Sequence, residues 1–238
     1  MIKRLLQSFV LLLFLIGFLA IAFLVYQHYF STDSNSSQYI RQFLQNPSEN
    51  TELSSEALTG CAGAPFILPT EGLIGLLWRD SAGPYSTTHR HTGLDIFSGK
   101  PAGTAPIYSV YDGYLTRLDD WQSTVIIRHD DPLQAGRTIW TYYTHMASED
   151  GNTIYISPEF PQGTYNKFVP QGTFLGYQGN YNPPFPIGVH LHISIVTSGN
   201  DGSFKNEAIL ENTLDPSPYF GLDLNADDQP ERPVRCIE

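Results

Sequence analysis

Four histidines and one aspartate, spread over three short segments, have the types and spacing of a metal site. The segment His91-Thr92-Gly93-Leu94-Asp95 offers an imidazole and a carboxylate four residues apart. In a helix or in an extended segment, that spacing lets both side chains share one face. Gly93 would let the backbone turn between them. These donor types suit zinc, which at catalytic sites takes three protein ligands and keeps one position open.

Two further segments supply the other histidines. His190-Leu191-His192 begins a run rich in apolar and β-branched residues, and the strand period of two points both imidazoles to the same face. One can therefore bind metal while the other faces substrate. His145 follows a predicted strand, where a strand end commonly opens onto a site. Each fragment alone is a weak signal, but the order HxGxD, YxHM, GxHLH is specific.

In this order the motifs resemble those of the lysostaphin/LytM family of peptidoglycan endopeptidases, over about residues 83–197. The resemblance implies that His91, Asp95 and His192 are the ligands of one zinc ion per chain. It implies that His145 and His190 are unligated active-site histidines. It also implies a zinc metalloendopeptidase that hydrolyses peptide bonds in peptidoglycan, in cell-wall remodelling or lysis.

Amide hydrolysis needs a nucleophilic water and a polarised carbonyl, and zinc can supply both effects. The unligated histidines would exchange protons with the water or hydrogen-bond the oxyanion, and their division of these tasks stays open. The alternative is a non-catalytic cell-wall-binding or regulatory protein of the same fold. Retention of all five residues favours the enzyme, and dependence on a protein regulator stays open.

Some features depart from the family pattern or stand outside it. The bulky loop at 181–187 replaces a small Ser/Thr/Gly-rich loop, so we expect a changed groove wall and substrate preference. His89 forms its own HxH pair with His91, so an exchange of ligands stays open, although we favour His91. His129, at a strand end, is interpreted as structural.

The elements that must position these residues are strands. From Phe66 onward, short apolar runs rich in Tyr, Thr, Val and Ile are punctuated by Gly, Pro, Asn and Asp, which predicts a mainly β (α+β) domain, a LytM-like antiparallel sheet with a zinc-site groove. Asp112-Gly113 has the composition of a tight hairpin turn. The predicted strands are Ile107–Tyr111, Tyr114–Leu118, Thr124–Arg128, Thr138–Tyr143, Ile154–Ile156, Thr173–Tyr177 and Val189–Val196.

The first 30 residues predict a transmembrane anchor. Every residue from Phe9 to Tyr26 is apolar or Gly, enough for a helix to cross a hydrocarbon layer about 30 Å thick. Lys3 and Arg4 would keep the N-terminus cytoplasmic and the rest extracytoplasmic, as a single-pass protein of the cell membrane. The alternative is a signal peptide, cleaved near Ala20-Ile21-Ala22, and a secreted protein.

Composition bounds the remainder of the 238-residue chain. Residues 31–60 are polar and predict a stalk, with one short amphipathic helix around Tyr39–Leu44. Residues 61–238 form the expected domain, with a turn-rich tail at 198–238 that wraps its surface. The net charge of −11, with scattered basic residues, argues against nucleic acid. Cys61 and Cys236, in an oxidising compartment, predict one disulfide.

Overall fold

The computed structural model describes Gly17 and residues 35–237. The predicted anchor at 1–30 lies outside the described residues, Gly17 apart. Among the residues that the structure does describe, no helix combines the length and the apolar character needed to span a bilayer. The predicted anchor therefore stays a prediction.

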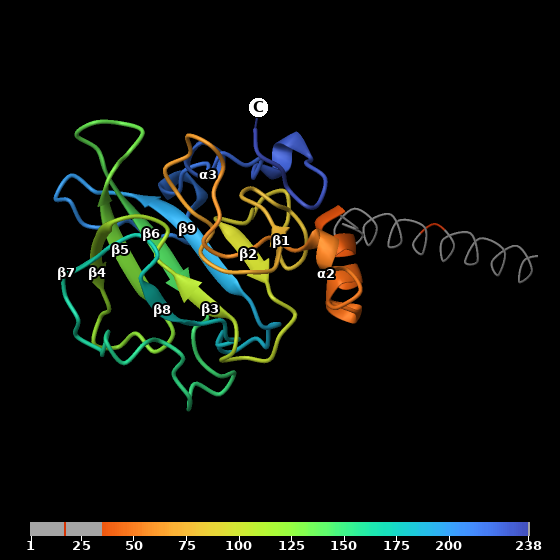
Figure 1. Cartoon of the computed structure of the whole chain (residues 1–238), viewed down its shortest axis with the longest axis horizontal. Helices are drawn as coiled ribbons and strands as arrows, with labels where there is room; N and C mark the ends of the chain where they lie inside the picture. Colours follow the sequence, from red (N-terminus) through yellow and green to blue (C-terminus); the bar gives the residue numbers. More distant parts are fainter. Residues whose placement is uncertain (1–16, 18–34, 238) are drawn as a thin grey trace, which may run out of the picture.

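A seven-stranded antiparallel sheet forms the body of the domain (Figure 1). Its order is β1-β2-β9-β6-β5-β4-β7, so that β2 and β9, far apart in the chain, lie side by side near one edge. The strands are β1 (Leu73–Leu76), β2 (Leu94–Phe97), β4 (Gly113–Thr116), β5 (Val125–Asp130), β6 (Thr138–Thr144), β7 (Lys167–Val169) and β9 (Leu191–Thr197).

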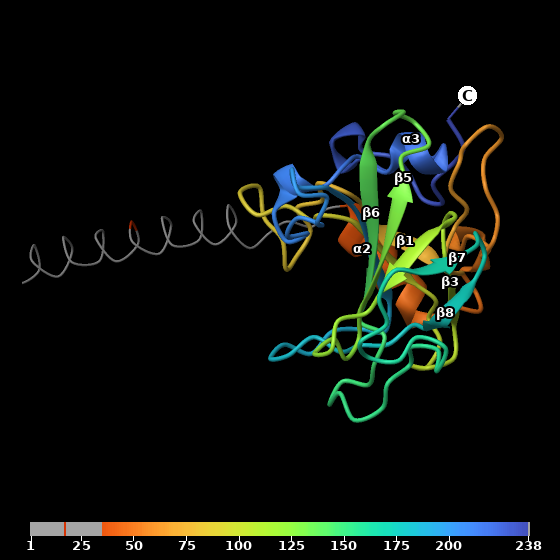
Figure 2. The same ribbon diagram turned by 90° about the vertical axis from the view of Figure 1, so that its left-hand side faces the viewer.

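A second antiparallel pair, β3 (Pro106–Tyr108) and β8 (Phe174–Tyr177), crosses one face of the main sheet (Figure 2). Ile107 of β3 and Leu175 of β8 join the main core cluster together with Ile193 and Ile195 of β9. Because side chains alternate along a strand, the residues between them on β9 point to the opposite face. His192 therefore lies on the face away from this core.

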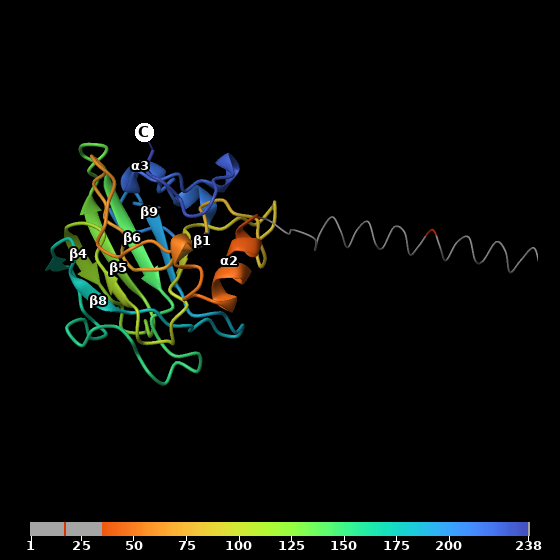
Figure 3. The same ribbon diagram turned by 45° about the vertical axis from the view of Figure 1, so that its right-hand side comes forward.

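Residues 35–60 do not stand apart from the sheet as a stalk would. The predicted amphipathic helix is present as α2 (Asn35–Gln45), beside β1 (Figure 3), and η1 (Thr51–Leu53) follows it. Phe43 is only 2% exposed and packs in a cluster with Leu73 and Phe97. The segment is polar overall, but a few apolar side chains within it pack against the domain.

Six of the predicted strands are present with shifted ends, and three short ones escaped prediction: β1, β2 and β7. The strand predicted at Ile154–Ile156 is wrong, because those residues make only isolated bridges. The hairpin predicted at Asp112-Gly113 is also wrong: β3 pairs with β8, whereas β4 pairs with β5 and β7. A Cβ on Gly113 would lie 2.5 Å from the Arg128 carbonyl oxygen, so this glycine permits close strand approach rather than a turn.

The tail after β9 returns across the domain. It contains η2 (Leu210–Asn212), α3 (Ser217–Phe220) and η3 (Ala226–Asp228). The predicted disulfide is confirmed: Cys61 and Cys236 are bonded, with their Cα atoms 5.6 Å apart. The guanidinium of Arg232 donates to the backbone oxygens of Ile74 and Gly75, so the tail also holds β1.

Candidate metal centre and active-site groove

His91 is placed by the loop that leads into β2. Its backbone N–H donates to the Asp80 carbonyl, and its own carbonyl accepts from the Arg79 N–H. On the imidazole, Nδ1 donates to the Leu77 carbonyl at 2.9 Å. Since that nitrogen carries the proton, Nε2 of this fully buried histidine is free to act as a ligand.

Asp95 and His192 are brought together by strand pairing. They are register partners in the antiparallel ladder of β2 and β9. A Cβ on Gly93 would lie 2.3 Å from the Ile193 carbonyl oxygen, and Gly93 is not among the glycines with positive φ. Gly93 thus allows β2 to approach β9 closely, instead of providing the turn that the sequence suggested.

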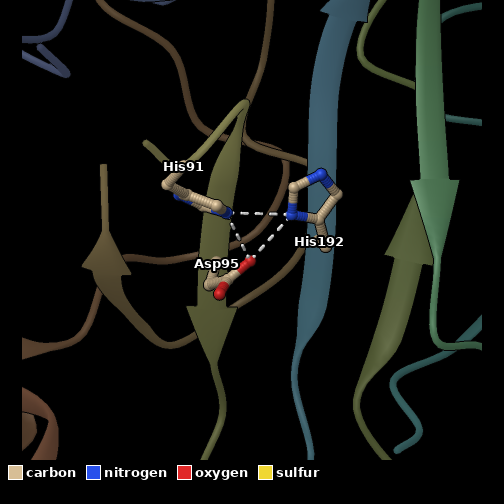
Figure 4. Close-up of side chains that lie close together, drawn as sticks. All are labelled: His91, Asp95 and His192. Atoms are coloured by element: carbon tan, nitrogen blue, oxygen red, sulfur yellow. Dashed lines mark hydrogen bonds and ion pairs between the residues drawn. The ribbon is translucent and has the colours of Figure 1, made fainter. Parts of the chain in front are cut away.

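Three donor atoms converge at this point (Figure 4). His91 Nε2 lies 3.0 Å from His192 Nδ1 and 3.1 Å from Asp95 Oδ1, and the third side, from His192 Nδ1 to Asp95 Oδ1, is 2.9 Å. All three residues are buried, and their ligand atoms lie within 4.8 Å of one another. Two imidazole nitrogens and one carboxylate oxygen are donor types that a three-ligand zinc site uses.

The electrostatics of the triad favour an ionised carboxylate. Burial alone would raise the pKa of Asp95, but the charges of His91 and His190 and hydrogen bonds from His192 and His91 hold it well below its usual range. Burial would lower the pKa of His192, yet the hydrogen bond with Asp95 and the nearby carboxylate of Glu207 raise it to about 10. Asp95 on one side of the His192 ring and Glu207 on the other therefore both favour positive charge at His192.

His145 and His190 lie beside the triad without joining it. Their ring centroids are 4.7 Å apart, and His190 Nε2 is 3.7 Å from Asp95 Oδ1. Each donates through Nδ1 to a backbone carbonyl, His145 to Tyr181 at 2.8 Å and His190 to Gly188 at 2.7 Å. Burial, followed by the neighbouring histidines, lowers the pKa of His145 to about 3. Burial likewise lowers the pKa of His190, so both rings are neutral at pH 7.

A groove of about 370 Å³ opens onto these side chains. One wall includes Asn182 and Ile187 of the bulky loop, and α2 contributes Ile40. The expected effect of the loop on the groove wall therefore matches its position, and the ligand triad is undisturbed. Phe97 stacks on His190 with centroids 4.9 Å apart and fixes the plane of that ring.

His89 and His129 lie outside the triad, as expected. His89 is exposed, and its backbone bonds to Ser86, so the triad contains His91 and not its neighbour. His129 is buried, where Nδ1 donates to the Asp112 carbonyl at 2.7 Å and Nε2 lies 2.7 Å from the Thr141 hydroxyl. Its role is structural.

Two further groove residues escaped the sequence analysis. The Tyr85 ring lies 4.7 Å from the His91 ring, and burial plus the charges of Asp95 and Glu207 raise the pKa of its hydroxyl. Glu207 reaches the triad from the tail, with Oε2 3.5 Å from His192 Nε2. Neither residue belongs to a periodic pattern or to a short motif, so no local signal in the sequence marks them.

No family model matches the chain, and no curated protein matches it. Solved structures do. Lysostaphin from Staphylococcus simulans is 19% identical with a TM-score of 0.39, over 61% of this chain and 48% of that one. A putative glycyl-glycine endopeptidase LytM from Ruminococcus gnavus is 24% identical with a TM-score of 0.38, over 60% and 50%.

The catalytic domain of a variant of the prophage-encoded M23 protein EnpA from Enterococcus faecalis is 21% identical with a TM-score of 0.37, over 64% of this chain and 96% of that one. The chain spans about half the length of lysostaphin and of the Ruminococcus protein. At these identities and TM-scores, what the chain does must be inferred from its own side chains. These three solved structures are a lysostaphin, a LytM and an M23 protein, the family that the motifs of this chain resemble.

Proposed function

We propose that this protein is a zinc-dependent endopeptidase that hydrolyses peptide bonds in peptidoglycan. The observation that carries the proposal is the convergence of His91 Nε2, Asp95 Oδ1 and His192 Nδ1 within 4.8 Å, beside two unligated neutral imidazoles in a groove. A hydrolytic metal site needs both sets, since ligands alone would serve a structural metal equally well.

His91, Asp95 and His192 would hold one zinc ion per chain. When bound, zinc supplies Lewis-acid polarisation of the scissile carbonyl and lowers the pKa of a water molecule to about 7. The ionised Asp95 contributes the negative charge that favours a dication, and the Leu77 carbonyl keeps the His91 proton on Nδ1, away from the metal. The protein thereby fixes the ligand tautomer before any metal arrives.

His145 and His190 would handle protons. Because each donates Nδ1–H to a backbone carbonyl, its Nε2 is the acceptor of the neutral ring and can take a proton from the attacking water. The same atom, once protonated, can donate to the oxyanion or to the leaving amine. Their low pKa values keep both rings in the acceptor form at neutral pH.

The substrate assignment rests on the family resemblance and on the shape of the site. An open groove bordered by Asn182, Thr92 and Ile40 presents both polar and apolar contacts, which suits an extended peptide better than a small metabolite. Peptidoglycan peptides are the substrate class that we propose.

The test is peptidoglycan solubilisation by the full-length protein, with zinc per chain measured by elemental analysis. We expect about one zinc per chain, release of peptide, loss of release with a chelator, and recovery on adding zinc. A protein that binds zinc yet releases no peptide from walls of any peptide chemistry would contradict catalysis and favour the regulatory alternative. A protein that binds no zinc would contradict the metal site.

We also propose that residues 1–30 anchor the chain in the membrane, with the domain outside the cytoplasm, on the strength of the apolar run Phe9–Tyr26 and of Lys3 and Arg4. A reporter enzyme that works only outside the cytoplasm should be active when it is fused after Glu238. Activity of a cytoplasm-specific reporter would refute this orientation. N-terminal sequencing of the mature protein separates an uncleaved anchor from a signal peptide.

A further inference from the structure

The imidazoles of His91, His145, His190 and His192 differ in what holds the nitrogen that faces away from the triad. In three of them that nitrogen donates to a backbone carbonyl: His91 to Leu77, His145 to Tyr181 and His190 to Gly188. His192 has no such carbonyl. Its Nε2 is buried and has no hydrogen-bond partner in the described part of the chain. The carboxylate oxygen Oε2 of Glu207 lies 3.5 Å from it.

We propose that Glu207 is a positioning residue that holds His192 with Nδ1 toward the metal. The inference rests on the zinc site proposed above. If Nδ1 of His192 is the ligand, the single proton of the neutral ring must sit on Nε2, and a buried N–H requires an acceptor. A carboxylate in that place fixes both the tautomer and the ring orientation, and it makes the ligand nitrogen more basic.

Glu207 is itself held in place. The Thr92 hydroxyl donates to Oε2 at 3.2 Å, and Thr92 directly follows the ligand His91. Around Glu207, the Asn212 side chain donates to the Asn206 carbonyl at 2.8 Å, and the Asn206 side chain accepts from the Ala208 N–H at 3.0 Å. One carboxylate thus connects the loop that carries His91 to the strand that carries His192.

A purely structural reading is that Glu207 fastens the tail to the sheet. The two readings differ in what they predict for the metal. A tail fastener affects the unfolding temperature and leaves the zinc affinity of the folded protein unchanged. A positioning residue affects zinc affinity even in a fully folded variant, because the ligand ring loses its orientation and its proton loses an acceptor.

The experiment compares zinc dissociation constants, measured by competition with a chromophoric chelator, for the full-length protein and its variants. Glu207→Gln keeps the size of the side chain but not its charge, and we expect it to weaken zinc binding about 10-fold. Glu207→Ala removes the acceptor entirely and should cost up to about 100-fold. Thr92→Val should cost less than Glu207→Ala, and Thr92→Ser, which keeps the hydroxyl, should restore wild-type affinity.

Glu211 provides a matched control, because it is an exposed glutamate of the same tail. Glu211→Gln and Glu211→Ala should bind zinc as the wild type does. The second readout is the visible absorption spectrum of the cobalt-substituted protein, which should shift for Glu207→Gln and not for Glu211→Gln, since it reports ligand geometry.

Wild-type zinc affinity and an unshifted cobalt spectrum in Glu207→Gln, with circular dichroism unchanged, would overturn the role of Glu207 and leave the proposed peptidase intact. A lowered unfolding temperature with unchanged zinc affinity would do the same in favour of the tail fastener. If Glu207→Ala does not fold, Glu207→Gln and Thr92→Val decide. A wild type that binds no zinc would overturn both proposals.

Discussion

Nε2 of His91 lies 3.0 Å from Nδ1 of His192, although 101 residues separate them in the chain. The contact exists because β2 pairs with β9 in a register that sets Asp95 opposite His192. His91 then enters from the loop immediately before β2. The geometry of the triad thus depends on the pairing of β2 with β9, so we expect changes to that pairing to alter metal binding.

Ligands and proton-handling residues should behave as two classes of variant. His91→Ala, Asp95→Ala and His192→Ala each remove one of three protein ligands and should lose zinc, and activity with it. His145→Ala and His190→Ala should keep most of the zinc but lose at least about 100-fold in rate, the scale of a general acid–base or oxyanion group. The measurements are zinc per chain and the rate of peptidoglycan solubilisation.

Circular dichroism of every variant is the folding control, because metal binding can itself stabilise the domain. His89→Ala should keep its zinc, since its side chain is outside the triad. Loss of zinc in His89→Ala together with its retention in His91→Ala would contradict the ligand assignment.

Gly93→Ala should damage the metal site without touching a ligand. The new Cβ would meet the Ile193 carbonyl oxygen at 2.3 Å, so β2 must move away from β9. We expect a loss of about 2 kcal/mol or more in the free energy of unfolding and a weaker affinity for zinc. Gly83→Ala, whose Cβ meets nothing within 4 Å, is the control in chemical denaturation. Equal stability of the two variants would argue against the close approach.

His129 should make stability depend on pH. Burial lowers the pKa of His129 to about 4, against the opposing hydrogen bond to the Asp112 carbonyl. The unfolded chain, with a pKa of about 6.5, binds the proton more readily, so stability is full above pH 6.5 and falls between pH 6.5 and 4. The whole decrease is on the order of 3 kcal/mol.

Denaturant unfolding at several pH values measures this slope. His129→Asn keeps a donor near the Asp112 carbonyl but cannot titrate, so its stability should fall less steeply over the same interval. Parallel curves for the wild type and His129→Asn would rule out His129 as the source.

The disulfide should contribute substantially to stability. Cys61 and Cys236 are 175 residues apart, and a loop of that length corresponds to about 5 kcal/mol in the chain-entropy account. The double variant Cys61→Ser/Cys236→Ser should therefore unfold at a clearly lower denaturant concentration than the oxidised wild type. A wild-type protein whose unfolding midpoint does not change on reduction would contradict this expectation.

Phe43→Ala tests whether α2 belongs to the folded body. Phe43 is 2% exposed among Leu73 and Phe97, and truncation of a buried phenylalanine costs about 3–5 kcal/mol. Its neighbour Leu44 is 40% exposed, so Leu44→Ala should change the free energy of unfolding by no more than about 0.5 kcal/mol. Similar unfolding curves for the two variants would mean that the packing of Phe43 does not contribute to the stability of the domain.

The residues proposed as ligands could be predicted from the sequence because each motif is short, and its spacing places its side chains on one face of a strand or of the segment that leads into it. The triad assembles from His91, Asp95 and His192, and the disulfide from Cys61 and Cys236. Strands such as β5 and β6 carried enough β-branched and aromatic residues to be predicted. In each case the prediction uses a short stretch of sequence or a single pair of residues.

The missed features lack a local signal. β1 and β2 have only four residues each, all buried, so no alternation marks them. Gly113 follows an aspartate as in a hairpin turn, but the requirement it meets is the approach of Arg128 on another strand. Glu207 stands in a polar run of the tail, and only the return of that tail brings it to His192. Features that depend on long-range approach cannot be read from neighbours in the chain.

The packing of α2 has a mechanical consequence. The helix is fastened to β1 through Phe43, β1 pairs with β2, and β2 carries Asp95 opposite His192 on β9. A pull on the chain at Asn35 would therefore reach, through α2 and β1, the strand that carries Asp95. An external load and the geometry of the triad are therefore coupled through the pairing of β2 with β9.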